Sequence, residues 1–325
     1  MASSAEVEPA ADFARSAVPE GQGSSGLHIA LIIIGGTIGF SIFIVAAQIG
    51  GALGFSGAAA AFALGSLILG VMGAITSYVG AKSRLSTYLL TEFAFGSTGA
   101  KIANLAVALS LIGWFGVISN ILGQATHSMI LESAGISIPV YLCILIASLL
   151  MIGVTVMGFT GIDRLALILV PIMVAFIGWA AYLAWQQSGA SPAVLQTSDF
   201  TFRTAVSAVV GSYISGVIIQ PDYSRFAKNI RSAVIAVFIA LGVVFPLIQF
   251  FSAVPSMMMG IPDIIQVMIG LGIIIPAFFL LLLGAWSSNV LCLYSSGLSI
   301  ATIVQKVKLA SIILGIGIVG TILAF

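Results

Sequence analysis

Charged side chains are scarce in this sequence. Only 6% of its 325 residues are Asp, Glu, Lys or Arg, whereas a soluble globular protein carries about 25%. Hydrophobic residues make up 60% of the chain, and the mean hydropathy is +1.22. Eleven basic and ten acidic residues leave a net charge of +1, so no overall field attracts a polyanion. This composition excludes a water-soluble enzyme, a disordered chain and a nucleic-acid-binding protein, and it indicates an all-α polytopic membrane protein.

Cysteine and histidine are also scarce. The two cysteines, Cys143 and Cys292, fall inside apolar stretches and form no CxxC pair, which excludes a disulfide framework and a cysteine metal centre. The two histidines, His28 and His127, lie near the ends of apolar stretches. Because almost no ionisable group lies inside a predicted span, an uncharged substrate fits better than an ion, and no metal beyond a coupling Na⁺ is expected.

The few charges divide the chain into membrane spans. Residues 21–81 contain no charged residue, and one helical crossing needs about 20 apolar residues, so this stretch is expected to cross twice with a turn among Gly50, Gly51, Gly54 and Gly57. An external segment around Pro255–Gln266 is expected to precede one long helix. The pattern predicts about nine spans, near residues 28–50, 57–80, 102–131, 138–158, 164–186, 204–220, 232–254, 271–303 and 308–325.

The basic residues orient these spans. With the N-terminus in the cytoplasm, ten of the eleven Lys and Arg residues lie in the N-terminal segment or in cytoplasmic loops, and only Arg203 lies outside. This asymmetry is what the positive-inside rule describes. The chain is expected to be an integral protein of the plasma membrane with a cytoplasmic N-terminus. Residues 1–26 are rich in Ser, Ala, Gly and Pro and are expected to form a disordered cytoplasmic tail, followed by a transmembrane domain over 27–325.

Glycines interrupt two of the predicted spans at corresponding places. Gly35, Gly36 and Gly39 lie near the middle of the first span, and Gly211 and Gly216 lie in the sixth. Interrupted helices in two halves of a chain indicate a transporter binding site, because unwound backbone at membrane depth must find a ligand, an ion or water. The alternative is that these glycines are helix-packing contacts.

Aromatic and hydroxyl side chains accompany these interruptions. Trp114 lies in the third span, Tyr213 in the sixth, and Ser287, Ser288 and Asn289 in the eighth. Such a lining suits a flat heterocycle, which would stack on the rings and bond through its edge. Taken singly, each of these residues could have a purely structural role. Aromatic residues are enriched at membrane–water interfaces, and serine hydroxyls often bond to a carbonyl of their own helix.

Four local motifs resemble those of the nucleobase–cation symporter family, of purine/cytosine permease type. They are YVGAKSRLSTYLLTEFAFGSTG at 78–99, GWFGV at 113–117, VVGSYISGVIIQPDYSRFAKN at 209–229 and AWSSNVLCLYSSGLS at 285–299. The resemblance implies a LeuT-type fold of two inverted five-helix repeats, with a first repeat over about 27–187 and an incomplete second repeat over about 203–325. It also implies transport of a nucleobase or related heterocycle with Na⁺ or H⁺.

The resemblance also implies site residues. The substrate is expected between aromatic rings and beside the sixth span, at Phe43, Trp114, Gly211, Ser212, Tyr213 and Ser215. The coupling cation is expected between main-chain carbonyls and hydroxyl groups, at Gly39, Ile42, Ser287 and Ser288.

Three features depart from the cytosine permease pattern. Leu111 replaces a glutamine suited to a pyrimidine edge, and Gly284 replaces an asparagine near the ion site. The sequence also ends at Phe325, inside the ninth span of the family pattern, so a second chain that supplies further helices is a conceivable partner.

The sequence therefore predicts a secondary active transporter, not an enzyme, that imports a nucleobase such as cytosine or a purine by alternating access. Its expected partners are this small heterocycle and membrane lipid, without nucleic acid and without a cofactor other than Na⁺. One alternative is a non-transporting or regulatory fragment of such a permease. A remote alternative is an intramembrane serine protease, because Gly54-Phe55-Ser56-Gly57 matches a GxSG pattern and His127 is available.

Overall fold

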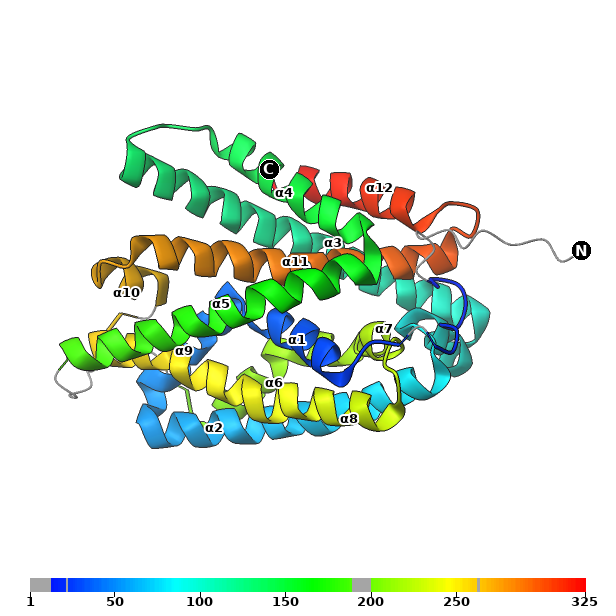
Figure 1. Ribbon diagram of the computed structural model, residues 1–325, viewed down its shortest axis with the longest axis horizontal. Helices are drawn as coiled ribbons and strands as arrows, with labels where there is room; N and C mark the ends of the chain where they lie inside the picture. The colour runs from blue at the N-terminus through cyan, green and yellow to red at the C-terminus, as the bar shows by residue number, and fades with distance from the viewer. Residues whose placement is uncertain (1–12, 22, 189–199, 262–263) are drawn as a thin grey trace, which may run out of the picture.

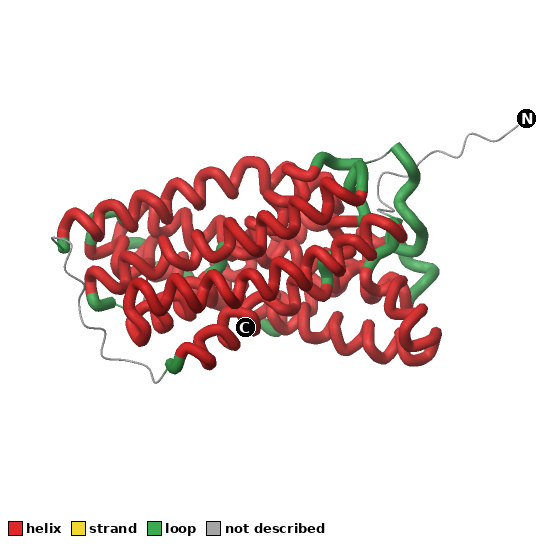
Figure 2. Tube along the Cα trace, turned by 90° about the horizontal axis from the view of Figure 1, so that it is seen from below, coloured by secondary structure: helices red, strands yellow, loops and turns green. Residues whose placement is uncertain are grey.

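The structure is a computed structural model that describes residues 13–21, 23–188, 200–261 and 264–325. Figure 1 shows an elongated bundle whose helices run mostly along its long axis, and Figure 2 shows that helix dominates the described chain. The elements in chain order are α1 Gly26–Thr37, α2 Phe40–Ser83, α3 Thr87–Ala134, α4 Val140–Val156, α5 Gly158–Gln187, α6 Phe202–Ile218, α7 Pro221–Ser224, α8 Ile230–Ile239, the π-helical turn η1 Ala240–Val244, α9 Phe245–Met259, α10 Ile264–Gly270, α11 Ile274–Ile303 and α12 Leu309–Ile322.

The predicted spans correspond to these helices. Within the described residues, five apolar helical stretches are long enough to cross a membrane, and α1, α4, α6 and α12 are shorter apolar helices. The first two predicted spans form α1 and the long α2, which reverses at Gly54 with a φ of 67° that favours glycine. The single long helix expected over 271–303 is α11. The segment Pro255–Gln266, expected to be external, contains the end of α9 and the start of α10, and residues 262–263 lie outside the described part.

The two expected helix interruptions have different outcomes. The first span is broken: α1 ends at Thr37, Ile38 and Gly39 are extended, and α2 begins at Phe40. The sixth span is not broken where it was predicted, because Gly211 and Gly216 lie inside the regular helix α6. That helix ends at Ile218, just before Pro221, which has no N–H to continue the hydrogen-bond pattern.

The helices form two groups that pack side by side. The bundle group contains α1, α2, α6, α8, η1 and α9, and the scaffold group contains α3, α4, α11 and α12. Helix α5 contacts α1 and α9 of the bundle group as well as α4 and α11 of the scaffold group, and it crosses diagonally between them in Figure 1. The bundle group consists of the helices of the first, second, sixth and seventh predicted spans.

The described part of the N-terminal segment packs against one end of the bundle. Ala14 and Val18 are buried, and Ser24 pairs with the chain after α7 through Ser24 N–H to Phe226 O at 2.6 Å and Lys228 N–H to Ser24 O at 3.0 Å. This contrasts with the disordered tail expected for residues 1–26, of which 1–12 and 22 lie outside the described residues.

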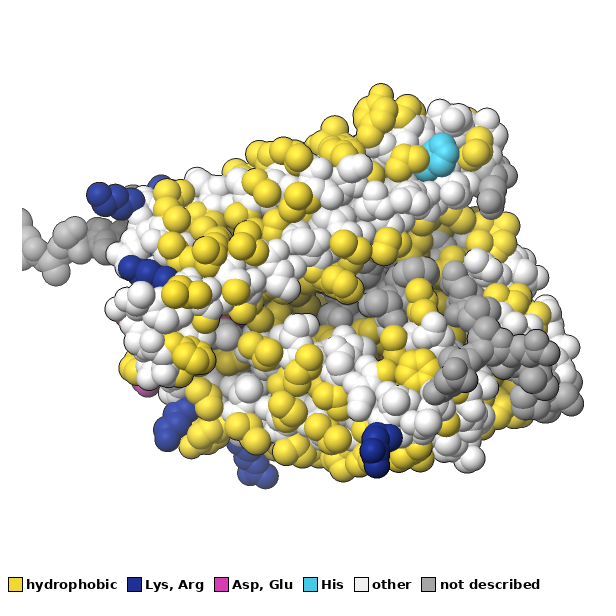
Figure 3. Space-filling view, turned by 180° about the vertical axis from the view of Figure 1, so that it is seen from behind, with side chains coloured by type: hydrophobic (Ala, Val, Ile, Leu, Met, Phe, Trp, Pro, Cys, Tyr) yellow, Lys and Arg dark blue, Asp and Glu magenta, His cyan; other side chains and the backbone are white. Residues whose placement is uncertain are grey.

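Most of the Lys and Arg side chains visible in Figure 3 gather at the end of the molecule next to the N-terminal segment, while its flanks are largely hydrophobic. We call this end the basic end. The exposed hydrophobic side chains on the flanks, such as Leu149, Ile168 and Ile318, at 58%, 63% and 57% exposure, are the surface that an integral membrane protein presents to lipid.

Candidate functional site

The break between α1 and α2 provides the backbone of the site. Ile38 and Gly39 are extended, so α1 ends and α2 begins beside each other in the middle of the bundle. The last carbonyls of a helix lack intrahelical partners, and so do the first N–H groups of the next helix. The break therefore presents the negative end of one helix dipole and the positive end of another at the same place.

Helix α11 faces this break with glycine and serine. A Cβ atom added at Gly284 would lie 2.8 Å from the carbonyl oxygen of Ile38, so only glycine leaves room for that carbonyl. A Cβ atom at Gly39 would lie 3.3 Å from Ser288 Oγ, and one at Gly35 would lie 2.5 Å from Ser287 Oγ. Both serine hydroxyls therefore lie close to the broken segment, where carbonyl and hydroxyl oxygens meet.

A cavity of about 520 Å³ opens beside the break, between the bundle and scaffold groups. This volume suits a small organic ligand. Among the described residues that line it, none carries a charge. The lining comprises Gly36, Gly39, Ile42, Ile44 and Val45 near the break, Ser110, Leu111, Trp114, Val117, Ile118 and Ile121 on α3, Gly211, Ser212, Tyr213, Ser215, Gly216 and Ile219 on or after α6, and Leu281, Ala285, Ser288, Leu291 and Cys292 on α11.

Two aromatic side chains line the cavity from opposite groups. Trp114 of α3 is 46% exposed. Tyr213 of α6 is buried, packs against Phe245 at a centroid distance of 5.8 Å, and directs its hydroxyl to the Ile33 carbonyl at 3.4 Å. A Cβ atom at Gly36 would lie 3.1 Å from this hydroxyl. Packing therefore fixes the Tyr213 ring, whereas the Trp114 ring is open to a stacking partner.

The remaining hydroxyl groups differ in their availability. Ser212 donates its hydroxyl to Val209 O of its own helix at 2.7 Å, which leaves its oxygen as an acceptor. Ser215 and Ser110 are exposed to the cavity, and Ser288 is half-buried. The cavity therefore combines apolar walls with a few neutral donors and acceptors, and that combination suits an uncharged polar ring better than an ion.

The structure brings most of the expected site residues together. Gly39, Ile42 and Ser288 of the cation set line the cavity, as do Trp114, Gly211, Ser212, Tyr213 and Ser215 of the substrate set. Two residues are placed elsewhere. Phe43 is buried in the core at 2% exposure, and Ser287 is buried against Gly35.

Sequence reasoning missed Ser110 and Cys292 as lining residues. Ser110 precedes Trp114 by one helical turn, and Cys292 follows Ser288 by one turn. Residues three or four apart share a helix face, so helical spacing from the residues already chosen was the available signal. Asn289 turns the other way: its side-chain amide donates to Phe115 O and Ser119 Oγ of α3, both at 3.1 Å, inside the scaffold group.

The broken helix at a cavity between two helix groups defines a membrane transporter of LeuT-type fold. Solved structures agree. Mhp1, a nucleobase-cation-symport-1 family transporter in a closed conformation with bromovinylhydantoin bound, matches with a TM-score of 0.84 and 19% identity, over 97% of this chain and 74% of that chain. MhsT in complex with L-phenylalanine matches with a TM-score of 0.68 and 17% identity, over 94% of this chain and 80% of that chain.

The particular family is shown by the sequence. Residues 27–325 match the family described as permeases for cytosine/purines, uracil, thiamine and allantoin, and the chain belongs to it. A cytosine permease of Escherichia coli O157:H7 is 34% identical over 265 residues, and that of strain K12 is 33% identical over the same length. In both cases the match covers 80% of this chain and 61% of the relative.

The family to which the chain belongs is one of permeases and not of enzymes. The groups of the protease alternative have structural roles of their own. His127 Nδ1 bonds to the carbonyl of Ile138 at 2.5 Å, and Gly54-Phe55-Ser56-Gly57 forms the reversal within α2.

Proposed function

We propose that this chain takes part in secondary active import of a nucleobase or a related planar, uncharged heterocycle. The observation that carries the proposal is the uncharged cavity beside the α1 break, with Trp114 on one wall and Tyr213 on another. The cytosine permeases among its relatives support this substrate class. Leu111, which lines the cavity, offers no amide to a pyrimidine edge, so the polar contacts would come from Ser110, Ser215 and the broken backbone.

Substrate transport would be coupled to a cation bound at the break between α1 and α2. Ile38 and Gly39 supply main-chain oxygens, and Ser288 Oγ lies beside Gly39. A hard cation such as Na⁺ prefers oxygen ligands (by analogy with Ca²⁺ and Mg²⁺). The two helix dipole ends at the break would favour a cation at the carbonyl end of α1 and electron-rich substrate atoms at the N-terminal end of α2.

Transport would proceed by alternating access. The bundle group would move against the scaffold group, so that the cavity between them opens first to one side of the membrane and then to the other. Ion and substrate must each bind one state more tightly for a gradient to be used. The basic end carries the N-terminal segment, so the positive-inside rule supports a cytoplasmic N-terminus.

Replacing Trp114 by Ala tests the site. Loss of a stacking face is expected to cost about 1–3 kcal/mol of binding free energy, or roughly 5- to 150-fold in affinity. Equilibrium binding of a panel of nucleobases and hydantoins to the purified protein measures this directly. Trp179→Ala is the matched control, because Trp179 of α5 is 45% exposed, close to the 46% of Trp114, and does not line the cavity.

Two outcomes would contradict the proposal: unchanged binding by Trp114→Ala, or equal losses in both variants. Ser288→Ala separates the ion from the substrate, since it is expected to weaken the effect of Na⁺ on binding while sparing the Na⁺-independent part. Uptake into vesicles then distinguishes a working carrier from a fragment that only binds.

A further inference from the structure

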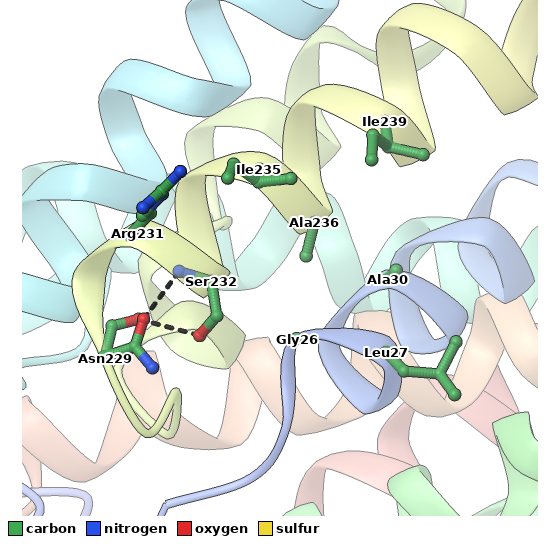
Figure 4. A pocket seen from close by; sticks show the side chains of 9 residues that line it. All are labelled: Gly26, Leu27, Ala30, Asn229, Arg231, Ser232, Ile235, Ala236 and Ile239. Atoms are coloured by element: carbon green, nitrogen blue, oxygen red, sulfur yellow. Dashed lines mark hydrogen bonds between the residues drawn. The ribbon is translucent and has the colours of Figure 1, made fainter.

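A second cavity lies between two helices of the bundle group and shares no lining residue with the first. It is a groove of about 470 Å³ between the first turns of α1 and the helix α8. Figure 4 shows its two ends: Asn229, Ser232 and Arg231 gather at one end, whereas Leu27, Ala30 and Ile239 lie at the other. The groove is therefore amphipathic along its length.

Small residues create the groove. Helix α1 begins at Gly26, level with Ser232, and a Cβ atom at Gly26 would lie 2.9 Å from the carbonyl oxygen of Ser232. The two helices touch there, and beyond the contact Ala30 and Ala236 leave the space between them unfilled. Leu27 and Ile239 are 64% and 44% exposed and form apolar walls. In a membrane such a space is filled by an acyl chain, since water gains no polar partner there.

The polar end of the groove carries an available positive charge. Asn229 Oδ1 accepts from Ser232 N–H at 2.8 Å, and Ser232 Oγ donates to Asn229 O at 2.9 Å, so these groups fix the start of α8. Arg231 is exposed, and no carboxylate among the described residues lies within ion-pairing distance of it. In Figure 4 its side chain lies at the same end of the groove as Asn229 and Ser232.

We propose that this groove binds one anionic phospholipid. One acyl chain would lie against Leu27, Ile235 and Ile239, and the phosphate would meet the guanidinium of Arg231 at the basic end. Basic grooves between membrane helices recognise anionic headgroups in this way, and the planar guanidinium suits a phosphate. A second copy of the chain fits less well, because a symmetric contact across the groove would bring the Arg231 side chains of the two copies together.

The test counts bound lipid by native mass spectrometry. Delipidated protein in non-ionic detergent receives equimolar phosphatidylglycerol and phosphatidylcholine with matching acyl chains. The wild-type protein is expected to bind phosphatidylglycerol about fivefold more than phosphatidylcholine at its first site, since one basic residue near a headgroup contributes about that factor. Arg231→Gln is expected to reduce the preference to about one.

Lys82→Gln is the matched control. Lys82 is an exposed cation at the C-terminal end of α2, also at the basic end, and it lies over the Tyr78 ring instead of lining the groove. This variant should keep the preference. A second pair tests the apolar end: Ile239→Gln should lower binding of both lipids, whereas Ile318→Gln, on the lipid-facing side of α12 at 57% exposure, should not.

Three results would overturn the proposal: a preference that survives Arg231→Gln, equal losses in Arg231→Gln and Lys82→Gln, or a dimer that replaces lipid binding and disappears in Ile239→Gln. The last result would assign the groove to a second copy of the chain. Because the readout is lipid mass and not substrate binding, failure here leaves the proposed transport function untouched.

Discussion

The bundle and scaffold groups meet in two different ways along the length of the molecule. At the basic end, hydrogen bonds connect them. At the centre, a cavity of about 520 Å³ separates them. Two of the polar bonds near it stay within one group: Tyr213 to Ile33 O in the bundle group, and Asn289 to Phe115 O in the scaffold group. The difference indicates that the basic end fastens the two groups while the centre leaves them free to hold a ligand.

Helix α7 carries most of the connections at the basic end. The Asp222 carboxylate accepts from Thr87 N–H of α3 and from Ser295 Oγ of α11, both at 2.8 Å. Tyr223 Oη lies 3.0 Å from Ser295 Oγ, and Arg225 donates to Tyr294 Oη at 3.1 Å. Arg225 Nε also donates to the main-chain carbonyl of Asp222 at 3.1 Å, which holds the turn after α7 together.

The largest effect is expected when this connection is broken. Asp222→Ala would remove the buried acceptor of Thr87 N–H and Ser295 Oγ and leave the buried Arg225 without its neighbouring negative charge. Breaking such a buried arrangement costs about 3–5 kcal/mol. Thermal denaturation in detergent should show a clear fall in the midpoint.

Asp163→Ala provides the comparison, because it removes an aspartate near the start of α5 that also pairs with a residue far away in the sequence. Asp163 pairs with His28 at 2.7 Å, and the side chains of His28 and Asp163 are 35% and 16% exposed, so the pair is only partly buried. Its contribution to stability is expected to be smaller, about 1 kcal/mol. Equal destabilisation by the two variants would show that the basic end does not fasten the groups in the way that the bonds of Asp222 imply.

The second largest loss of stability is expected at the centre of the molecule, where α11 faces the break between α1 and α2. Gly284→Ala would place a methyl group 2.8 Å from the Ile38 carbonyl oxygen, and this backbone atom can move only if the break between α1 and α2 shifts. Overpacking of this kind costs about 1–3 kcal/mol, and ligand-induced thermal stabilisation should fall as well. Gly315→Ala on α12 meets nothing within 4 Å and should change neither quantity. If both variants behave alike, the break does not depend on the space at Gly284.

The sequence predicted the two regions unequally. The break in the first span followed from Gly35, Gly36 and Gly39, because clustered glycines weaken a helix and allow close approach. In the sixth span the same reasoning failed: Gly211 and Gly216 line the cavity from within a regular helix, and the helix ends before Pro221 instead. The missing N–H of proline was the stronger signal.

The sequence did not predict which side chains of α2 point into the cavity. Phe43 was expected at the substrate, but Ile42 and Val45 line the cavity while Phe43 is buried in the core. Consecutive helical residues point about 100° apart, and the rotation of α2 about its axis is set by packing against α6 and α9. The bonds of Asp222 to Thr87 and Ser295 join residues 135 and 73 positions away, and no local pattern encodes such pairs.

The third effect tests the contribution of the N-terminal segment. Arg15 donates to the carbonyls of Ala301 at 2.9 Å, Val304 at 2.9 Å and Val307 at 2.6 Å, at the end of α11. Arg15→Gln should weaken this contact by about 1 kcal/mol, because the bonds are charge-assisted but partly exposed. If the basic end opens as one unit, its open fraction should rise about fivefold.

The native thiol Cys292, which lines the cavity, reports this opening. In a Cys143→Ser background, an impermeant maleimide added on the basic side of sealed vesicles should label Cys292 faster in Arg15→Gln than in the parent. Arg203→Gln, which changes a basic residue at the start of α6 outside the basic end, should label at the parent rate. Equal rates in all three proteins would mean that the N-terminal segment does not help to close the basic end.

The smallest effect is a pH dependence at Asp222, which lies in the connection between α6 and α8. Burial raises the pKa of this carboxyl from 3.8 to about 6, against the opposing effect of Arg225. The folded protein therefore favours the protonated form, so the stabilising contribution is complete below pH 3.8 and is lost as the pH rises through about 6. Between pH 7.5 and 5.5, linkage gives a gain in the free energy of unfolding that stays below about 1 kcal/mol. Asp222→Asn, which cannot titrate, should flatten this part of the denaturation midpoint profile relative to wild type, and an unchanged slope would place the titrating group elsewhere.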